Sequence, residues 1–394
     1  MAYIEATRQQ VEPSWHFNNV EFARQRWDQE PETNLKDLYR LRAQQLRDKY
    51  DWIRIEASGG GDSTTAIFSF LLNDIHLDEI VFRYPKQAEK DVVGNARDIK
   101  PENTLSEWEF AAQPLLDWVK TNYPKTTVTF HDYSKEIVDG SYMQDESWIF
   151  TTRDWFQPGH GAKHTNFGTK EHRSLADSGK QIGVIYGIDK PRVVLINNHW
   201  YTYFTDVFAN HANPVVEDYN NITTELFYWT PDLPEIVIKQ SHMIKAWFDL
   251  THNQNLKNLV VFPTNNPNLR TAYESIAKSI IYPDYDQQTW QTAKPTSSFY
   301  NEMDHWFHVN LKDTQMHSVW ESGLKYIVDN ISKDLLHYQD GIPTGLRWNK
   351  SLFYHLGPST STVTTTKFSN HQYTSTVSEE ITVLQDQKLR RISV

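Results

Sequence analysis

The chain has 394 residues, and its 39% hydrophobic and 23% charged residues are typical of a folded globular protein. Lys and Arg total 39 against 50 Asp and Glu, and the net charge of -11 argues against long nucleic-acid duplexes as partners. The absence of cysteine excludes disulfides, thiolate zinc sites, cysteine-ligated iron–sulfur clusters and cysteine nucleophiles.

No apolar run approaches the roughly 20 residues of a membrane span, and residues 1–8 lack the apolar stretch of a secretory signal. We therefore expect a cytoplasmic protein without a membrane partner. The oligomeric state is not indicated by the sequence.

The first half of the chain alternates between helices and strands. Residues 34–47 carry leucines at helical spacing and predict an amphipathic helix. The patterns that follow predict a strand at 52–57, a helix at 64–72, a strand at 77–83, a helix at 104–123, a strand at 126–132, a helix at 169–178, and strands at 181–187 and 192–197. This alternation predicts a parallel five-stranded, Rossmann-like sheet with helices on both faces.

Beyond about residue 240 the pattern changes to helical periodicity, at 236–251, 268–281 and 316–336. Residues 359–394 are rich in Ser and Thr and predict an edge strand or an extended arm. The predicted organisation is a helical lead-in at 1–50, an α/β domain at 51–240, and a mainly helical substrate or partner domain with a β-like tail at 241–394.

The strongest motif follows the first predicted strand and reads Ser58-Gly59-Gly60-Gly61-Asp62-Ser63-Thr64. The glycines allow a tight turn, and their amides with the N-terminus of the next helix favour a phosphate. Hydroxyl groups of Ser58, Ser63 and Thr64 add donors, while Asp62 suits Mg²⁺ held against phosphate oxygens. The motif matches neither the Walker loop nor the dinucleotide fingerprint. The alternative is an ordinary glycine-rich turn.

This loop resembles the signature of the PP-loop ATP pyrophosphatases, the adenine nucleotide α-hydrolase-like superfamily. The resemblance implies that ATP is bound by its phosphates and cleaved between the α and β phosphates, with Mg²⁺ on Asp62. It covers about residues 50–200. The combination of a familiar loop with an unmatched C-terminal half also resembles bacteriophage-encoded members.

A second segment is similar to the phosphoadenosine phosphosulfate reductase branch, in which a lysine precedes a strand that ends in Gly-Ile-Arg. Lys170 and Gly187-Ile188 match this pattern, but Asp189 takes the place of the arginine. The resemblance makes Lys170, Lys190 and Arg192 candidates for stabilising the α-phosphate. The alternative for each of them is a solvated charge on the protein surface. The cysteines of that branch are absent.

The resemblance without cysteine leaves adenylation of a small-molecule or nucleotide substrate as the expected chemistry. The adenine would lie near Arg83 and Gly187, because ligands of parallel sheets bind at the carboxyl ends of the strands. The alternatives are a nucleotide-binding sensor or assembly component that has lost turnover, and a sulfonucleotide-binding protein without redox activity.

Histidines at positions 160, 164 and 172 lie close in sequence. They are compatible with substrate contact, with a metal site or with chance proximity. His305 and His308 lie in a Trp-rich stretch and are expected to serve packing.

Overall fold

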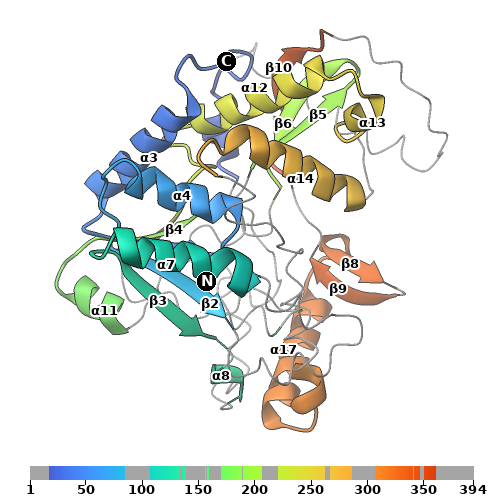
Figure 1. The fold of residues 1–394 in the computed structure, drawn as a ribbon. Coiled ribbons are helices and arrows are strands. Elements are labelled where there is room, and N and C mark those ends of the chain that lie inside the picture. Colours follow the sequence, from blue (N-terminus) through green and yellow to red (C-terminus); the bar gives the residue numbers. More distant parts are fainter. Residues whose placement is uncertain are drawn as a thin grey trace.

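The structure is a computed structural model of the chain. It describes residues 17–84, 107–133, 135–138, 156, 158, 170–188, 190–205, 221–261, 267–285, 307–339, 341–346 and 350–360. A five-stranded sheet, ordered β3-β2-β1-β4-β7, forms its centre, and every neighbouring pair in it is parallel. The strands are β1 (Trp52–Ala57), β2 (Glu79–Tyr84), β3 (Thr127–Asp132), β4 (Ile182–Tyr186) and β7 (Ile222–Leu226). The predicted fold class is confirmed (Figure 1).

The fifth strand of this sheet differs from the sequence-based expectation. The predicted strand at 192–197 is β5 (Arg192–Ile196), which pairs antiparallel with β6 (His199–Tyr203). Asn197 and Asn198 have φ of 48° and 64°, the left-handed geometry that a two-residue hairpin turn requires. The link from β4 to β5 is too short for a parallel crossover, which takes a dozen or more residues. β10 (Tyr354–Pro358) completes this second sheet, ordered β10-β6-β5.

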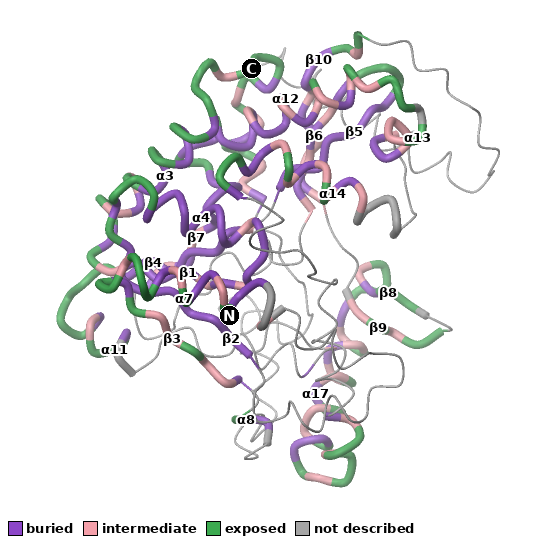
Figure 2. Tube along the Cα trace, in the orientation of Figure 1, coloured by how far each residue is buried: buried purple, intermediate pink, exposed green. Residues whose placement is uncertain are grey.

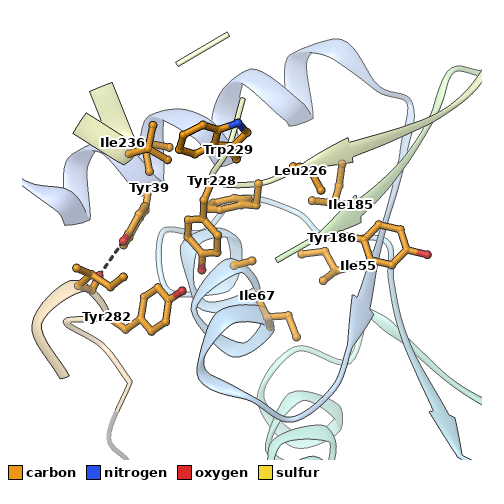
Figure 3. Packing of buried hydrophobic residues seen from close by; sticks show 14 of the residues in the cluster. Tyr39, Ile55, Ile67, Ile185, Tyr186, Leu226, Tyr228, Trp229, Ile236 and Tyr282 are labelled. Carbon is orange, nitrogen blue, oxygen red and sulfur yellow. Dashed lines mark hydrogen bonds between the residues drawn. The ribbon is translucent and has the colours of Figure 1, made fainter. Parts of the chain in front are cut away.

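The two faces of the parallel sheet have different chemistry, because successive side chains alternate between them. Ile55 points to the face covered by α3 (Leu35–Lys49), α4 (Gly61–Leu71) and α7 (Gln113–Asn122) (Figure 3), and Ile53, two residues earlier, shares that face. Arg54 and Glu56 point to the opposite face, where His172 of α11 (Lys170–Asp177) contacts Arg54. One face is therefore apolar and the other carries buried charges.

Helices dominate the region after the sheet, as predicted. The longer ones are α12 (Glu235–Leu250), α14 (Pro267–Ile281) and α17 (Gln315–Asn330), with β8 (Leu336–Gln339) and β9 (Ile342–Leu346) forming a small antiparallel sheet. The short elements are α2 (Asn19–Phe22), η1 (Glu107–Ala112, a π-helix), α8 (Lys135–Val138), α13 (Gln254–Lys257) and η3 (Lys333–Leu335). The strand or arm predicted at 359–394 lies almost wholly outside the described residues.

Aromatic residues from distant parts of the chain form one cluster. Trp27 stacks on Tyr354 with ring centroids 4.3 Å apart, and Phe22 packs on Trp229 at 4.6 Å. Indole groups rarely bury without a hydrogen-bond partner, and Trp27 Nε1 donates to the Phe22 carbonyl at 2.7 Å. Figure 2 shows buried residues along β1, β4, α4, α12 and β5, whereas β3 at the edge of the sheet is intermediate or exposed. No helix within the described ranges is long and apolar enough to cross a bilayer.

Candidate functional site

The glycine-rich loop connects β1 to α4 at the carboxyl end of the parallel sheet. Gly59 has φ of 70°, and a Cβ there would lie 2.8 Å from the backbone nitrogen of Ala112 in η1. Both the left-handed backbone and the close approach of another chain segment require glycine. The loop therefore has one defined path, in which Gly60 is the N-cap of α4 with φ -80° and ψ 161°.

Hydroxyl groups hold the loop closed. Ser63 Oγ donates to the Gly60 carbonyl at 3.3 Å and accepts from the Ser58 amide at 3.1 Å, while Ser58 Oγ accepts from the Gly60 amide at 3.3 Å. The Thr64 hydroxyl is buried and has no hydrogen-bond partner among the described residues. Buried hydroxyls are normally paired, so an unpaired donor beside a helix N-terminus fits a ligand that carries acceptor oxygens.

Asp62 is the centre of the site. Its Oδ1 lies 3.1 Å from Lys190 Nζ and accepts from the Tyr282 hydroxyl, and its Oδ2 lies 3.9 Å from Lys278 Nζ. Burial alone would raise the pKa of Asp62, but the two ammonium groups and the Tyr282 hydrogen bond lower that pKa to about 2. The carboxylate is therefore ionised at neutral pH.

Gly187, which follows β4, packs against the backbone of Asp62. A Cβ on Gly187 would lie 2.7 Å from the Asp62 carbonyl oxygen, so only glycine lets the end of β4 approach the first turn of α4 this closely. The Tyr228 hydroxyl, which comes from the segment after β7, donates to the same carbonyl at 2.7 Å. Figure 3 shows Tyr39, Tyr228 and Tyr282 lying together beside α4. Asp62 is thus held by three separate parts of the chain.

The structure brings some of the sequence-predicted residues together and separates others. Lys190 and Gly187 meet the loop at Asp62. Arg192 pairs with Glu274 at 2.5 Å and lies over the Tyr273 ring at 5.3 Å. Lys170 is the first residue of α11, but its side chain lies outside the described part of the structure, as do Asp189, His160, His164 and His305.

Arg83 belongs to a buried ionic network on the charged face of the sheet. Its Nε donates to Glu56 Oε2 at 2.9 Å, and its Nη1 donates to His131 Nδ1 at 2.8 Å. Arg54 on the neighbouring strand also pairs with Glu56. Burial opposes ionisation of Glu56, but Arg54 and Arg83 lower its pKa to about 2. Sequence analysis placed Arg83 near an adenine, and its guanidinium lies in this network.

His172 extends the network to Glu79, the first residue of β2. Its Nδ1 is 3.2 Å from Arg54 Nη1, and its Nε2 is 2.7 Å from Glu79 Oε2. Since arginine can only donate, Nδ1 accepts and Nε2 carries the proton donated to Glu79. Both ring nitrogens of His172 are therefore engaged within the protein. His308 lies 3.2 Å from His317 and packs against Trp320, in agreement with its expected packing role.

Three residues at the site were missed by the sequence analysis: Tyr228, Lys278 and Tyr282. Lys278 and Tyr282 are four positions apart at the end of α14, a spacing that places two side chains on the same helical face. That spacing was a usable signal for a shared role. Nothing in the sequence indicated that the shared face meets Asp62, which lies more than 200 residues earlier.

Asp62 could contribute to a magnesium site. Asp62 is the one carboxylate described at the loop, so Mg²⁺ there would need phosphate oxygens and water as its remaining ligands, as is usual for this ion. The oxygen donor fits, although Lys278 and Tyr282 occupy the same carboxylate. Elsewhere in the described residues no three His, Asp or Glu side chains are arranged to hold a metal ion.

The strand order and parallel pairing define a Rossmann-like α/β protein. No protein-family model matches the chain, and no curated protein matches it.

Proposed function

We propose that the chain binds ATP through residues 58–64 and cleaves it between the α and β phosphates, transferring AMP to a small-molecule or nucleotide substrate. The observation that carries this proposal is the meeting of the loop, the N-terminus of α4 and two ammonium groups at Asp62. Amide donors and the positive helix end favour phosphate oxygens at this position. The resemblance of residues 58–64 to the PP-loop supports the position of the cleaved bond.

Each residue of the proposed site has a role that follows from its chemistry. The amides at the N-terminus of α4 and the Thr64 hydroxyl bind phosphate oxygens, and Lys190 stabilises the charge that develops as pyrophosphate leaves. Asp62 would hold Mg²⁺ together with the phosphates, and the bound ion would supply further charge neutralisation. Arg192 and Lys170 remain candidates for the α-phosphate.

A second candidate function is nucleotide binding without turnover, as a sensor or assembly component. Its support is the saturation of Asp62 by Lys190, Lys278 and Tyr282 within the protein itself. A carboxylate with these partners is stable without a metal ion, so its presence alone does not require catalysis.

Incubation with α-labelled ATP and Mg²⁺, followed by separation of AMP and ADP, tests the choice. With no substrate added, water would take the AMP group in its place, so the proposal predicts free AMP and pyrophosphate. Asp62→Ala should slow their release about 100-fold, the usual effect of losing one such electrostatic group. Asp117→Ala, which removes an exposed carboxylate of α7, is the matched control and should keep the wild-type rate. Formation of ADP would overturn the proposal, while ATP binding without AMP would support the second candidate.

A further inference from the structure

Lys278 belongs to the helical region after the sheet, yet its ammonium group lies at the N-terminus of α4. Its Nζ is 3.9 Å from Asp62 Oδ2, while Lys190 Nζ approaches Oδ1 to 3.1 Å. The Lys278 side chain is 21% exposed and that of Lys190 only 4%. The more distant and more exposed ammonium group is the one that can change partner.

The C-terminal end of α14 and the residues after it are anchored to the body of the protein. The Tyr39 hydroxyl donates to the Ile281 carbonyl at 2.7 Å, and Lys36 pairs with Asp284 at 2.6 Å just after the helix. A Cβ on Gly61 would lie 3.1 Å from the ring of Tyr285, so this segment also contacts the loop itself. Lys278 is therefore carried to the site by a well-anchored helix.

Stability alone gives little reason for this arrangement. Two ammonium groups that share one carboxylate repel each other, and a cation near the positive end of a helix is unfavourable. A partly exposed ion pair with the longer separation of Lys278 contributes little to folding. The arrangement becomes favourable when a multiply charged anion joins it, because the anion interacts well with both lysines and with the helix end.

We propose that Lys278 is a phosphate-binding residue of the nucleotide site, resting on Asp62 in the free protein and moving to the polyphosphate when ATP binds. This inference rests on the proposed function and extends it, because α14 then supplies part of the site. The ligand class is a polyphosphate, with pyrophosphate as its minimal form.

The test is calorimetric binding of inorganic pyrophosphate and of ATP to the full chain. Lys278→Gln should weaken both about tenfold, as expected for one charge-assisted contact, and Lys278→Arg should restore most of the affinity. Lys36→Gln is the matched control, because it removes a lysine that anchors the same segment through Asp284 rather than through Asp62. Its affinity should equal that of the wild type.

Salt separates a direct contact from a structural effect. The ratio of wild-type to Lys278→Gln affinity should shrink from about 50 mM to about 500 mM NaCl, because added ions screen a charge–charge contact. Wild-type affinity in Lys278→Gln, or an equal loss in Lys36→Gln, would overturn the inference and leave ATP binding by the loop intact. If the wild type binds neither pyrophosphate nor ATP, both the inference and the proposed function fail.

Discussion

Glu56 and Asp62 lie on either side of the three glycines of the loop, and both have a pKa lowered to about 2. Glu56 is inside the sheet, 8% exposed, and its partners are arginines on β1 and β2. Asp62 is 22% exposed, and its partners come from separate segments and include two lysines. A low carboxylate pKa therefore does not identify a ligand site here. We propose that Asp62, whose partner Lys278 is partly exposed, belongs to a ligand site, whereas Glu56, whose partners Arg54 and Arg83 are buried, belongs to the framework of the sheet.

The largest expected effect comes from neutralising each carboxylate in turn. Glu56→Gln should cost about 3–5 kcal/mol of unfolding free energy, because it leaves buried guanidinium charges without their anion. Asp62→Asn should cost only about 1–2 kcal/mol, because the amide oxygen still accepts from Lys190 and Tyr282 and because Lys278 reaches solvent. Urea denaturation of both variants measures the difference. Equal losses would contradict the distinction between framework and site.

Lowering the pH should reveal the contribution of Glu56 to stability. The pKa of Glu56 is about 2 in the folded protein, against an ordinary value of 4.5. The ionised carboxylate therefore contributes to the free energy of unfolding above pH 4.5, and this contribution is lost as the pH falls towards 2. The difference corresponds to about 3 kcal/mol of stability. Glu56→Gln should therefore flatten the acid side of the stability profile, measured as the urea midpoint against pH. A variant profile parallel to that of the wild type would show that other groups control acid unfolding.

The smallest expected effect concerns two tyrosine hydroxyls that each donate to a carboxylate with two cations. Tyr282 donates to Asp62, and Tyr50 donates to Glu225, which also pairs with Arg42 and Lys49. Tyr282→Phe and Tyr50→Phe should each cost about 1 kcal/mol of stability, the usual net value of one hydrogen bond.

Pyrophosphate affinity distinguishes these two variants. Tyr50→Phe should bind pyrophosphate as the wild type does, because Glu225 lies outside the proposed site. Tyr282→Phe should change the affinity, because it removes a donor that competes for Asp62. Identical affinities in both variants would argue against any coupling between α14 and the ligand.

Most of the parallel sheet was predictable from local pattern. β1, β2, β3 and β4 have strong β-propensity and lie close to their predicted ranges, and the loop has an unambiguous glycine signature. β7 is short and was not predicted, and its place was expected for β5. What decides between these two strands is the length of the connection from β4, which forces β5 into a hairpin.

The parts of the site that depend on distant segments could not be predicted. Arg54 and Glu56 alternate with isoleucines and read as the exposed side of a half-buried strand, because their pairing with Arg83 arises only across strands. Lys278 reads as an ordinary charge on an amphipathic helix. Its contact with Asp62 depends on the packing of α14, which is set by tertiary contacts such as that of Tyr39 with Ile281.

Because the chain is synthesised from its N-terminus, the second sheet can be completed only late in synthesis. β10 pairs with β6 in the register Tyr354↔Thr202, and the Tyr354 ring stacks on Trp27. Closing such distant contacts costs more chain entropy than closing local ones, and folds rich in them form slowly. A nascent chain can assemble the parallel sheet once β7 has emerged, but Trp27 stays without its stacking partner until Tyr354 arrives. We therefore expect the aromatic cluster to be the last part of the core to form during synthesis.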